Sequence, residues 1–502
     1  MSAMTQAQPD AAATPTPGAW WCAAAVTVVL AAFGGRYGLH RDELYFVEAG
    51  HHPAWGYPDQ PPLVPLLATA WSAVSGGSVL AFRLVPAVLA GLVVLVAAAT
   101  SRALGGRPRD QMGTAVVMAC STLVLATGHL FSTTTFDVLL TALAVLLLVR
   151  ALAATAPDSR ALGRWLLLGA VAGVAMEVKT LPATVLAACG IALLLVGPRR
   201  PLLTPGPWLA ALVAGVLAAP NLLWQARNGW PQLELARAIA AGSSGTSAQR
   251  WAIVPLQITL LGLTAPLIVV GVVVALRSPW ARLHRWVAVA YLVLLAFVVV
   301  TGGKPYYTAG LLPALVALAM PASLDWAARR RLVAGMLLAA GAVITAVVAL
   351  PILPVRATGP LIAVNYDAGE TIGWPAFVRT VESVTAAIPA ADRARAVILT
   401  SNYGEAGALD RARRAGSPLP PVYSGHNAYG LWGPPPDGRD VVVLVGRDSD
   451  ARMGEYFRTC RLVAWIDNRL GIDNDEQGAP VRVCAGLVAP WGALWPHLTH
   501  LG

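Results

Sequence analysis

Charged side chains are scarce in this sequence of 502 residues. They occupy 12% of the positions, whereas hydrophobic side chains occupy 56%. A soluble globular chain ordinarily carries about 25% charged residues. The shortage therefore excludes an ordinary soluble protein and predicts a polytopic α-helical membrane protein.

Lysine is nearly absent, since only Lys179 and Lys304 are lysines among the 36 basic residues. The arginines instead gather in short segments between apolar stretches. If the N-terminus is cytoplasmic, every second connection is cytoplasmic and basic, which is the positive-inside pattern. These connections lie near residues 102–109, 150–164, 199–200, 277–285 and 329–331. The net charge of +10 thus reflects membrane topology, and no nucleic-acid partner is expected.

Long apolar stretches recur up to residue 352 and are absent after it. A stretch of about 17 to 25 apolar residues suffices to cross a bilayer. We therefore predict eleven crossings, and the same alternation places the chain after them outside the cell. The predicted spans are 20–36, 81–100, 111–130, 136–153, 165–178, 181–197, 207–223, 252–276, 286–301, 306–322 and 332–352.

The two ends of the chain differ from this apolar region. Residues 1–18 contain no lysine or arginine, so they make a poor signal peptide and are expected to be a disordered tail before an uncleaved first span. Residues 19–354 form the predicted membrane domain, and residues 355–502 a soluble external α/β domain. Its expected elements are a helix at 404–415 and strands at 396–402, 420–425, 440–446, 461–467 and 481–488.

Cysteine is also rare, with five residues in the chain. Cys22, Cys120 and Cys189 fall within predicted spans, where a small apolar residue is the ordinary interpretation. Cys460 and Cys484 fall in the external domain, where an oxidising environment would allow them to form a disulfide.

The sequence contains no glycine-rich phosphate-binding loop, but polar residues gather at the predicted outer ends of spans. "HRDELYF" carries Asp42 and Glu43, and "STTTFD" carries Asp137. Adjacent helical residues point about 100° apart, so only one of the pair is expected to face a pocket, and we favour Asp42. Asp137 has an alternative explanation, because a carboxylate near a helix start also stabilises the helix end.

Both lysines lie at predicted outer span ends, against the positive-inside pattern. Lys304 precedes Tyr306 and Tyr307 in "GGKPYY". An ammonium group at the headgroup level suits a phosphate, although lysines at span ends also extend toward water without binding anything.

Another polar segment, "AWGYPDQPPL", carries Tyr57, Asp59 and Gln60. It predicts a loop followed by a short helix on the outer membrane surface, and an ordinary interfacial helix would look the same.

In this order, "HRDELYF", "GYPDQPPL", "TTTFD" and "GKPYY" resemble motifs of the bacterial family-39 glycosyltransferases, a group similar to protein O-mannosyltransferases and lipid A aminoarabinose transferases. "SNYGEAGALD" and "VYSGHNAYGLWG" resemble the external domain of many such proteins. The resemblance implies a C-type glycosyltransferase (GT-C) fold. It also implies a sugar donor carried on a polyprenyl phosphate, and transfer with inversion at the outer face.

The resemblance further implies roles for individual residues. Asp42 would be the catalytic base, while Glu43 and Asp137 would support the acceptor site or a metal. The remaining candidates would bind substrate, with the lysines and tyrosines at the lipid phosphate: Lys179, Lys304, Tyr306, Tyr307, Tyr57, Asp59 and Gln60. No cofactor is certain, and a divalent metal is a candidate. The acceptor is left open among a lipid, a glycan and a protein of the cell envelope.

A membrane transporter or flippase is the main alternative. Transporters place polar sites near the bilayer midplane and often contain internal repeats. Here the span centres are rich in Ala, Leu and Val, and the polar residues gather at one face. A receptor or structural role is a weaker alternative. In the external domain, His426 and Asn427 either contact sugar or form local hydrogen bonds.

Overall fold

The computed structural model describes residues 14–153, 159–242, 247–447 and 455–502. Their contacts form two compact units. We call the first the helical unit, which holds the described residues up to Ala32, Arg83–Leu223 and Ile239–Leu350. The second, the mixed unit, holds Phe33–Phe82, Trp224–Ala238 and Pro351–Gly502. The predicted tail lies mostly outside the described residues, but helix α1 already begins at Pro17.

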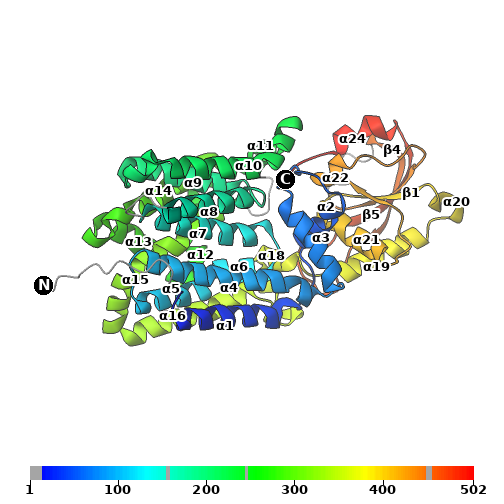
Figure 1. Cartoon of the computed structure of the whole chain (residues 1–502). Helices are drawn as coiled ribbons and strands as arrows, with labels where there is room; N and C mark the ends of the chain where they lie inside the picture. Colours follow the sequence, from blue (N-terminus) through cyan, green and yellow to red (C-terminus); the bar gives the residue numbers. More distant parts are fainter. Residues whose placement is uncertain (1–13, 154–158, 243–246, 448–454) are drawn as a thin grey trace. The chain divides into compact units, whose positions relative to one another are not determined.

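Apolar helices dominate the helical unit, where α7 packs against α8 and α9 against α14 (Figure 1). Seven helical segments are long and apolar enough to cross a membrane: α1 (Pro17–Gly34), α4 (Val79–Ala103), α7 (Thr133–Leu152), α10 (Pro205–Arg227), η5 with α14 (Pro279–Thr301), η6 with α15 (Pro305–Arg329) and α16 (Arg331–Ala349). The chain is therefore a multi-pass membrane protein. On α16, side chains such as Leu332 and Met336 are largely exposed, as suits a surface that contacts lipid.

Two further apolar helix pairs are bent, as in a broken span or a re-entrant loop, and hydropathy alone does not predict the bends. Helices α5 (Pro108–Ala119) and α6 (Thr122–His129) meet at 53°, where the Ser121 side chain starts the second helix by accepting a hydrogen bond from Val124 N–H. The segments Pro255–Thr264 and Pro266–Arg277 meet at 98°, and within the first of them Gly262 adopts a φ of 56°. A positive φ interrupts a helix and favours glycine. The second bent pair contains η3 (Pro255–Gln257), α12 (Ile258–Leu261), η4 (Gly262–Thr264) and α13 (Pro266–Arg277).

Each of the eleven predicted spans coincides with a helix or a bent pair. Seven are the long segments and two are the bent pairs. The other two are the shorter apolar helices α8 (Ser159–Met176) and α9 (Leu181–Val196). Seven to nine segments of the described chain therefore meet the length of a crossing, fewer than the eleven predicted.

A five-stranded sheet forms the core of the mixed unit, in the order β2-β1-β3-β5-β4. Strand β1 is parallel to β2 and β3, whereas β5 is antiparallel to β3 and β4. Its core includes Val397, Leu399, Trp491 and Trp495. All five predicted strands are found, as β1 (Ala396–Thr400), β2 (Val422–Ser424), β3 (Val441–Val445), β4 (Phe457–Trp465) and β5 (Pro480–Leu487).

Helices surround this sheet and continue into the N-terminal part of the unit. The predicted helix at 404–415 is α21. Among the described residues, the helices of the mixed unit are α2 (Arg41–His51), α3 (Leu63–Ser75), most of α11 (Pro231–Ala240), α17 (Gly359–Ile362), α18 (Tyr366–Gly369), α19 (Trp374–Ala386), α20 (Ala390–Arg393), α21 (Tyr403–Arg414), α22 (Ala428–Leu431) and α24 (Trp491–Leu498). Short 3-10 turns are η7 (Val355–Ala357) in the same unit, and η1 (Arg200–Leu203) and η2 (Arg250–Ala252) in the helical unit.

The predicted disulfide is present. Cys460 and Cys484 are bonded, and they lie directly opposite each other on the antiparallel strands β4 and β5. Cys22, Cys120 and Cys189 are free.

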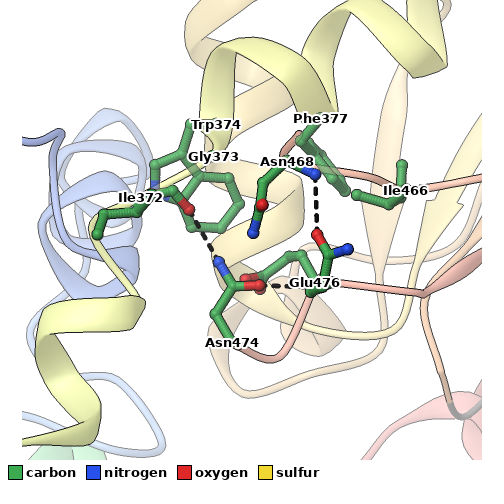
Figure 2. A pocket seen from close by; sticks show the side chains of 9 residues that line it. Ile372, Gly373, Trp374, Phe377, Ile466, Asn468, Asn474 and Glu476 are labelled. Carbon is green, nitrogen blue, oxygen red and sulfur yellow. Dashed lines mark hydrogen bonds between the residues drawn. The ribbon is translucent and has the colours of Figure 1, made fainter. Parts of the chain in front are cut away.

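The loop between β4 and β5 is attached to the start of α19 (Figure 2). Asn474 Nδ2 donates a hydrogen bond of 2.8 Å to the carbonyl of Ile372, and the backbone N–H of Asn468 donates one of 2.8 Å to the side chain of Gln477. Glu476 lines the small cavity of about 10 Å³ enclosed there, and burial raises the pKa of its carboxyl group well above the usual range. The loop is thus fixed by amide side chains and holds a buried acid.

Candidate functional site

Helix α2 carries the acidic pair, and His40 caps its start. The backbone N–H of Asp42 donates a hydrogen bond of 3.2 Å to His40 Nδ1, and that of His40 donates one of 2.8 Å to Glu43 Oε2. This reciprocal arrangement is a capping box, which satisfies backbone donors at a helix start. Glu43 therefore has a structural contact that fixes the helix carrying Asp42.

The two acids have different surroundings, as expected for adjacent helical residues. Glu43 is fully buried, whereas the side chain of Asp42 is 36% exposed. Asp42 Oδ1 accepts a hydrogen bond of 2.8 Å from the hydroxyl of Tyr403. The fully buried member of the pair is thus Glu43, and Asp42 is the member that keeps an accessible carboxylate.

Asp59 lies in the same unit and is bound by a chain of donors. Its Oδ1 accepts a hydrogen bond of 2.8 Å from the hydroxyl of Tyr45, and its Oδ2 one of 3.5 Å from Asn427 Nδ2. The backbone N–H of Ala428 in turn donates to the Tyr45 oxygen at 3.3 Å. Burial raises the pKa of Asp59 to about 7; the Tyr45 hydrogen bond lowers it, and the charge of Asp42 raises it further. Near neutral pH, Asp59 is therefore divided between its two protonation states.

Tyr57 and Gln60 are both buried in the loop beside Asp59. The Tyr57 hydroxyl donates a hydrogen bond of 2.8 Å to the carbonyl of Ala49. The backbone carbonyl of Tyr57 accepts one of 3.0 Å from Gln225 Nε2. The polar groups of Tyr57 therefore hold the loop. Gln60 Nε2 has no hydrogen-bond partner among the residues that the structure describes, so it retains a donor for a ligand.

Arg41 and Tyr403 also belong to this region, although no pattern in the sequence predicted them. Arg41 pairs with Glu370 at 3.3 Å and with Asp475, and its guanidinium carbon lies 5.1 Å from the centre of the Tyr403 ring. The Tyr403 ring centre is also 4.6 Å from that of Tyr45. The "SNYGEAGALD" motif signalled this region, but no local pattern connected it with Asp42.

His426 and Asn427 follow β2 and have different surroundings. Asn427 contacts Asp59 and also accepts a hydrogen bond of 3.2 Å from the backbone N–H of Gly502. His426 is buried, and its ring centre lies 4.7 Å from that of Tyr403. Burial lowers the pKa of His426 well below the usual range, so its ring is neutral at physiological pH.

In the helical unit, Asp137 lies inside α7 and not at its end. The cap is Ser132, whose side chain accepts a hydrogen bond from Thr135 N–H. Asp137 occupies the second turn, is 4% exposed, and accepts a hydrogen bond of 2.9 Å from Thr141 Oγ1. The explanation of Asp137 as a capping residue is therefore wrong.

Lys179 follows α8 and is held by a hydroxyl group and two aromatic rings. Its Nζ donates a hydrogen bond of 3.1 Å to Thr134 Oγ1 and lies 5.1 Å and 5.4 Å from the ring centres of Tyr306 and Tyr307. It also interacts electrostatically with Asp137. Cation–π contacts of this kind orient an ammonium group, so Lys179 is fixed in place by the protein.

The segment η6 (Pro305–Leu311), which carries both tyrosines, is attached to its surroundings at two points. The side chain of buried Gln257 donates a hydrogen bond of 2.8 Å to the carbonyl of Pro305 and accepts one of 2.6 Å from Thr308 Oγ1. At Gly310, an added Cβ atom would lie 2.3 Å from Thr141 Cγ2, so only glycine allows this close approach to α7. Gln257 was not among the predicted site residues, although a polar residue inside an apolar span often marks a functional position.

The predicted site residues therefore form two groups. The helical unit brings together Asp137, Lys179, Tyr306 and Tyr307, and Lys304 is the partly buried residue that precedes η6. The mixed unit brings together Asp42 and Asp59, with Tyr57 and Gln60 in the adjoining loop. Within the described ranges, no group of three or more His, Cys, Asp or Glu residues is arranged to hold a metal ion.

Known proteins resemble the chain both in sequence and in fold. Residues 59–224 match the family model described as dolichyl-phosphate-mannose-protein mannosyltransferase. ArnT from Cupriavidus metallidurans bound to undecaprenyl phosphate aligns with a TM-score of 0.63 and 16% identity, over 93% of this chain and 98% of that one. The chain has the GT-C fold.

The apo state of the same ArnT aligns with a TM-score of 0.59 and 16% identity, over 92% of this chain and 97% of that one. No curated protein matches the sequence. The family resemblance expected from the motifs is thus confirmed by the GT-C fold and by the family model over residues 59–224.

Proposed function

We propose that this protein is a membrane glycosyltransferase that moves a sugar from a polyprenyl-phosphate donor to an acceptor of the cell envelope. The observation that carries the proposal is the position of Lys179, whose ammonium group is fixed by Thr134, Tyr306 and Tyr307 in a unit built of apolar helices. A fixed cation at the end of an apolar helix suits the phosphate of a membrane lipid. The fold shared with ArnT, which has been observed with undecaprenyl phosphate bound, supports this interpretation.

In the proposed reaction, Asp42 removes the proton of an acceptor hydroxyl group. The acceptor oxygen then attacks the anomeric carbon as the bond from that carbon to the phosphate oxygen breaks, so the configuration inverts. Lys179, Lys304, Tyr306 and Tyr307 stabilise the negative charge on the leaving polyprenyl phosphate.

The other candidates support these groups. Glu43 fixes the start of the helix that carries Asp42. Asp137 interacts electrostatically with Lys179 and so helps to hold its ammonium group. Asp59 and Gln60 offer a carboxyl group and a donor to the acceptor, in a loop held by Tyr57.

The proposed orientation in the cytoplasmic membrane has the N-terminus inside and residues 355–502 outside. It rests on the alternation of arginine-rich connections. A reporter enzyme fused after Gly502 is expected to be active only outside the cytoplasm. Activity restricted to the cytoplasm would overturn the orientation and the outer-face reaction together.

Transfer itself is tested with purified protein and a polyprenyl-phosphate sugar whose sugar carries a radiolabel. Release of polyprenyl phosphate together with label on a cell-envelope acceptor is expected from the wild type and not from Asp42→Asn. Movement of the intact donor across vesicles without cleavage would instead identify a flippase and contradict the proposal.

A further inference from the structure

The last third of the chain supplies hydrogen-bond donors to two acids of the mixed unit, Asp42 and Asp59. Tyr403 donates to Asp42, and Asn427 donates to Asp59. Ala428 N–H supports the Tyr45 hydroxyl, which is the second donor to Asp59. We propose that the external domain is a working part of the transfer site and that Tyr403 is a positioning residue for Asp42, an inference that rests on the proposed function.

The backbone at Tyr403 is held by its neighbours in sequence, independently of the contacts of the Tyr403 side chain. Helix α21 begins there with a capping box, in which the side chain of Asn402 accepts a hydrogen bond from Glu405 N–H and the side chain of Glu405 accepts one from Asn402 N–H. Such a cap sets the direction in which the first helical side chain leaves the backbone. The backbone position from which the Tyr403 side chain extends is therefore fixed.

Two glycines let α21 approach α2 closely. A Cβ atom added to Gly404 would lie 2.7 Å from Arg41 Cβ, and one added to Gly407 would lie 3.1 Å from the backbone carbon of Leu44. Contacts this short cannot form with a larger residue unless the neighbour shifts. Glycine is therefore required at these positions of "SNYGEAGALD", because it allows α21 to bring Tyr403 to the helix that carries Asp42.

The ring of Tyr403 is surrounded on several sides. Its centre lies 4.6 Å from that of Tyr45, 4.7 Å from that of His426, and 5.1 Å from the guanidinium carbon of Arg41. Arg41 is held in turn by the buried Glu370. A ring packed in this way has little rotational freedom, so its hydroxyl group has a fixed direction.

The hydrogen bond leaves one oxygen of Asp42 for the reaction. Tyr403 occupies Oδ1, while Oδ2 lies 3.9 Å from His40 Nδ1, an atom that already accepts the backbone N–H of Asp42. Oδ2 is thus the oxygen that can take a proton from an acceptor hydroxyl group. A base held by one oxygen presents the other in a constant direction, which is how positioning accelerates a reaction.

The test compares Tyr403→Phe with Tyr429→Phe in the purified full-length protein, using the radiolabelled polyprenyl-phosphate sugar. Both changes remove one hydroxyl group that donates to a carboxylate, because Tyr429 donates 3.0 Å to Asp410 in the same unit. Tyr403→Phe should lower kcat roughly 10- to 100-fold, the range for a hydrogen bond to a charged group, with an unchanged KM for the donor. Tyr429→Phe should keep the wild-type kcat.

The pH dependence separates positioning from simple loss of structure. A hydroxyl donor favours the ionised carboxylate, and a protonated carboxylate cannot act as a base. Tyr403→Phe should therefore move the acidic limb of the kcat profile to higher pH. The other titratable or charged groups around Asp42 and Tyr403 are the same in both variants: His40, Arg41, Glu43, Asp59, His426.

A second measurement keeps the test valid if Tyr403→Phe fails to fold. Incorporation of 3-fluorotyrosine at position 403 keeps the ring and the hydroxyl group but makes the hydroxyl a stronger donor. The acidic limb should then move to lower pH. An unchanged limb in this protein, or a Tyr403→Phe variant that behaves like Tyr429→Phe, would overturn the inference.

The outcomes also separate this inference from the proposed function. A wild-type protein that cleaves no polyprenyl-phosphate sugar overturns both. A wild type that transfers sugar, an inactive Asp42→Asn variant and a Tyr403→Phe variant equal to Tyr429→Phe would overturn only the role of Tyr403 and of the external domain.

Discussion

The helical unit and the mixed unit hold their candidate residues in contrasting ways. In the helical unit, a single ammonium group, that of Lys179, is held by one hydroxyl and two aromatic rings. In the mixed unit, Asp42 and Asp59 are bound by donors from segments more than 360 residues away in the sequence. Lys179 retains capacity for a further anionic partner, whereas each of the two acids is already oriented by at least one hydrogen-bond donor. The first arrangement suits binding of an anion, and the second suits precise placement of a reacting carboxylate.

The largest effect on this comparison is expected from Asp42→Asn. The change keeps the shape and the contact with Tyr403 but removes the basic oxygen, so kcat should fall roughly 10²- to 10⁴-fold. The measurement is turnover of the labelled donor, with membrane insertion and thermal stability checked alongside. Near-normal turnover would show that the reacting base lies elsewhere.

The next effect is expected from the lysines. Lys179→Met and Lys304→Met should each weaken donor binding roughly 10- to 150-fold, because a charged donor to a phosphate contributes about 1.5–3 kcal/mol. Titration with the donor lipid measures this, and Thr134→Val, which removes one hydroxyl contact of Lys179 but no charge, should weaken binding less than Lys179→Met. Wild-type affinity in both lysine variants would mean that neither side chain binds the phosphate of the donor.

A smaller effect is expected from Gly310→Ala in the helical unit. The added methyl group would meet Thr141 at 2.3 Å and push η6 away from α7. Overpacking of this kind costs about 1–3 kcal/mol of stability, and the tyrosines on η6 should bind the donor several-fold more weakly. Gly335→Ala, where a new Cβ meets nothing within 4 Å, is the control. If both variants bind alike, the close contact at Gly310 does not position the tyrosines.

The smallest effect is expected from Asp59→Asn and concerns the pH dependence of stability. The raised pKa of Asp59, about 7, means that the folded state holds this proton more tightly than the unfolded state. Stability from this group is therefore present at low pH and is lost as pH rises from about 4 through about 7. The side chain of the variant is neutral at every pH, so its melting temperature should change less with pH in that window. If the melting temperatures of variant and wild type change with pH in parallel, the raised pKa of Asp59 is contradicted.

Hydropathy and alternation predicted much of the fold, since apolar runs mark helices and short β-branched runs mark strands. The bend at Ser121 and the left-handed backbone at Gly262 escaped prediction because they depend on a side-chain cap and on one backbone torsion. The acids and lysines were found individually from their unusual positions. The contact between Asp42 and Tyr403 could not be found, because nothing local in a sequence specifies a partner 361 positions away.

The distribution of the mixed unit along the chain has a consequence for its synthesis. Residues 33–82 emerge from the ribosome early, whereas Tyr403, Asn427 and Ala428 emerge after the segments of the helical unit. The acids at positions 42 and 59 therefore exist for most of translation without the donors Tyr403 and Asn427. The nascent protein can complete its apolar helices first and gains an ordered carboxylate pair only as a late step of maturation.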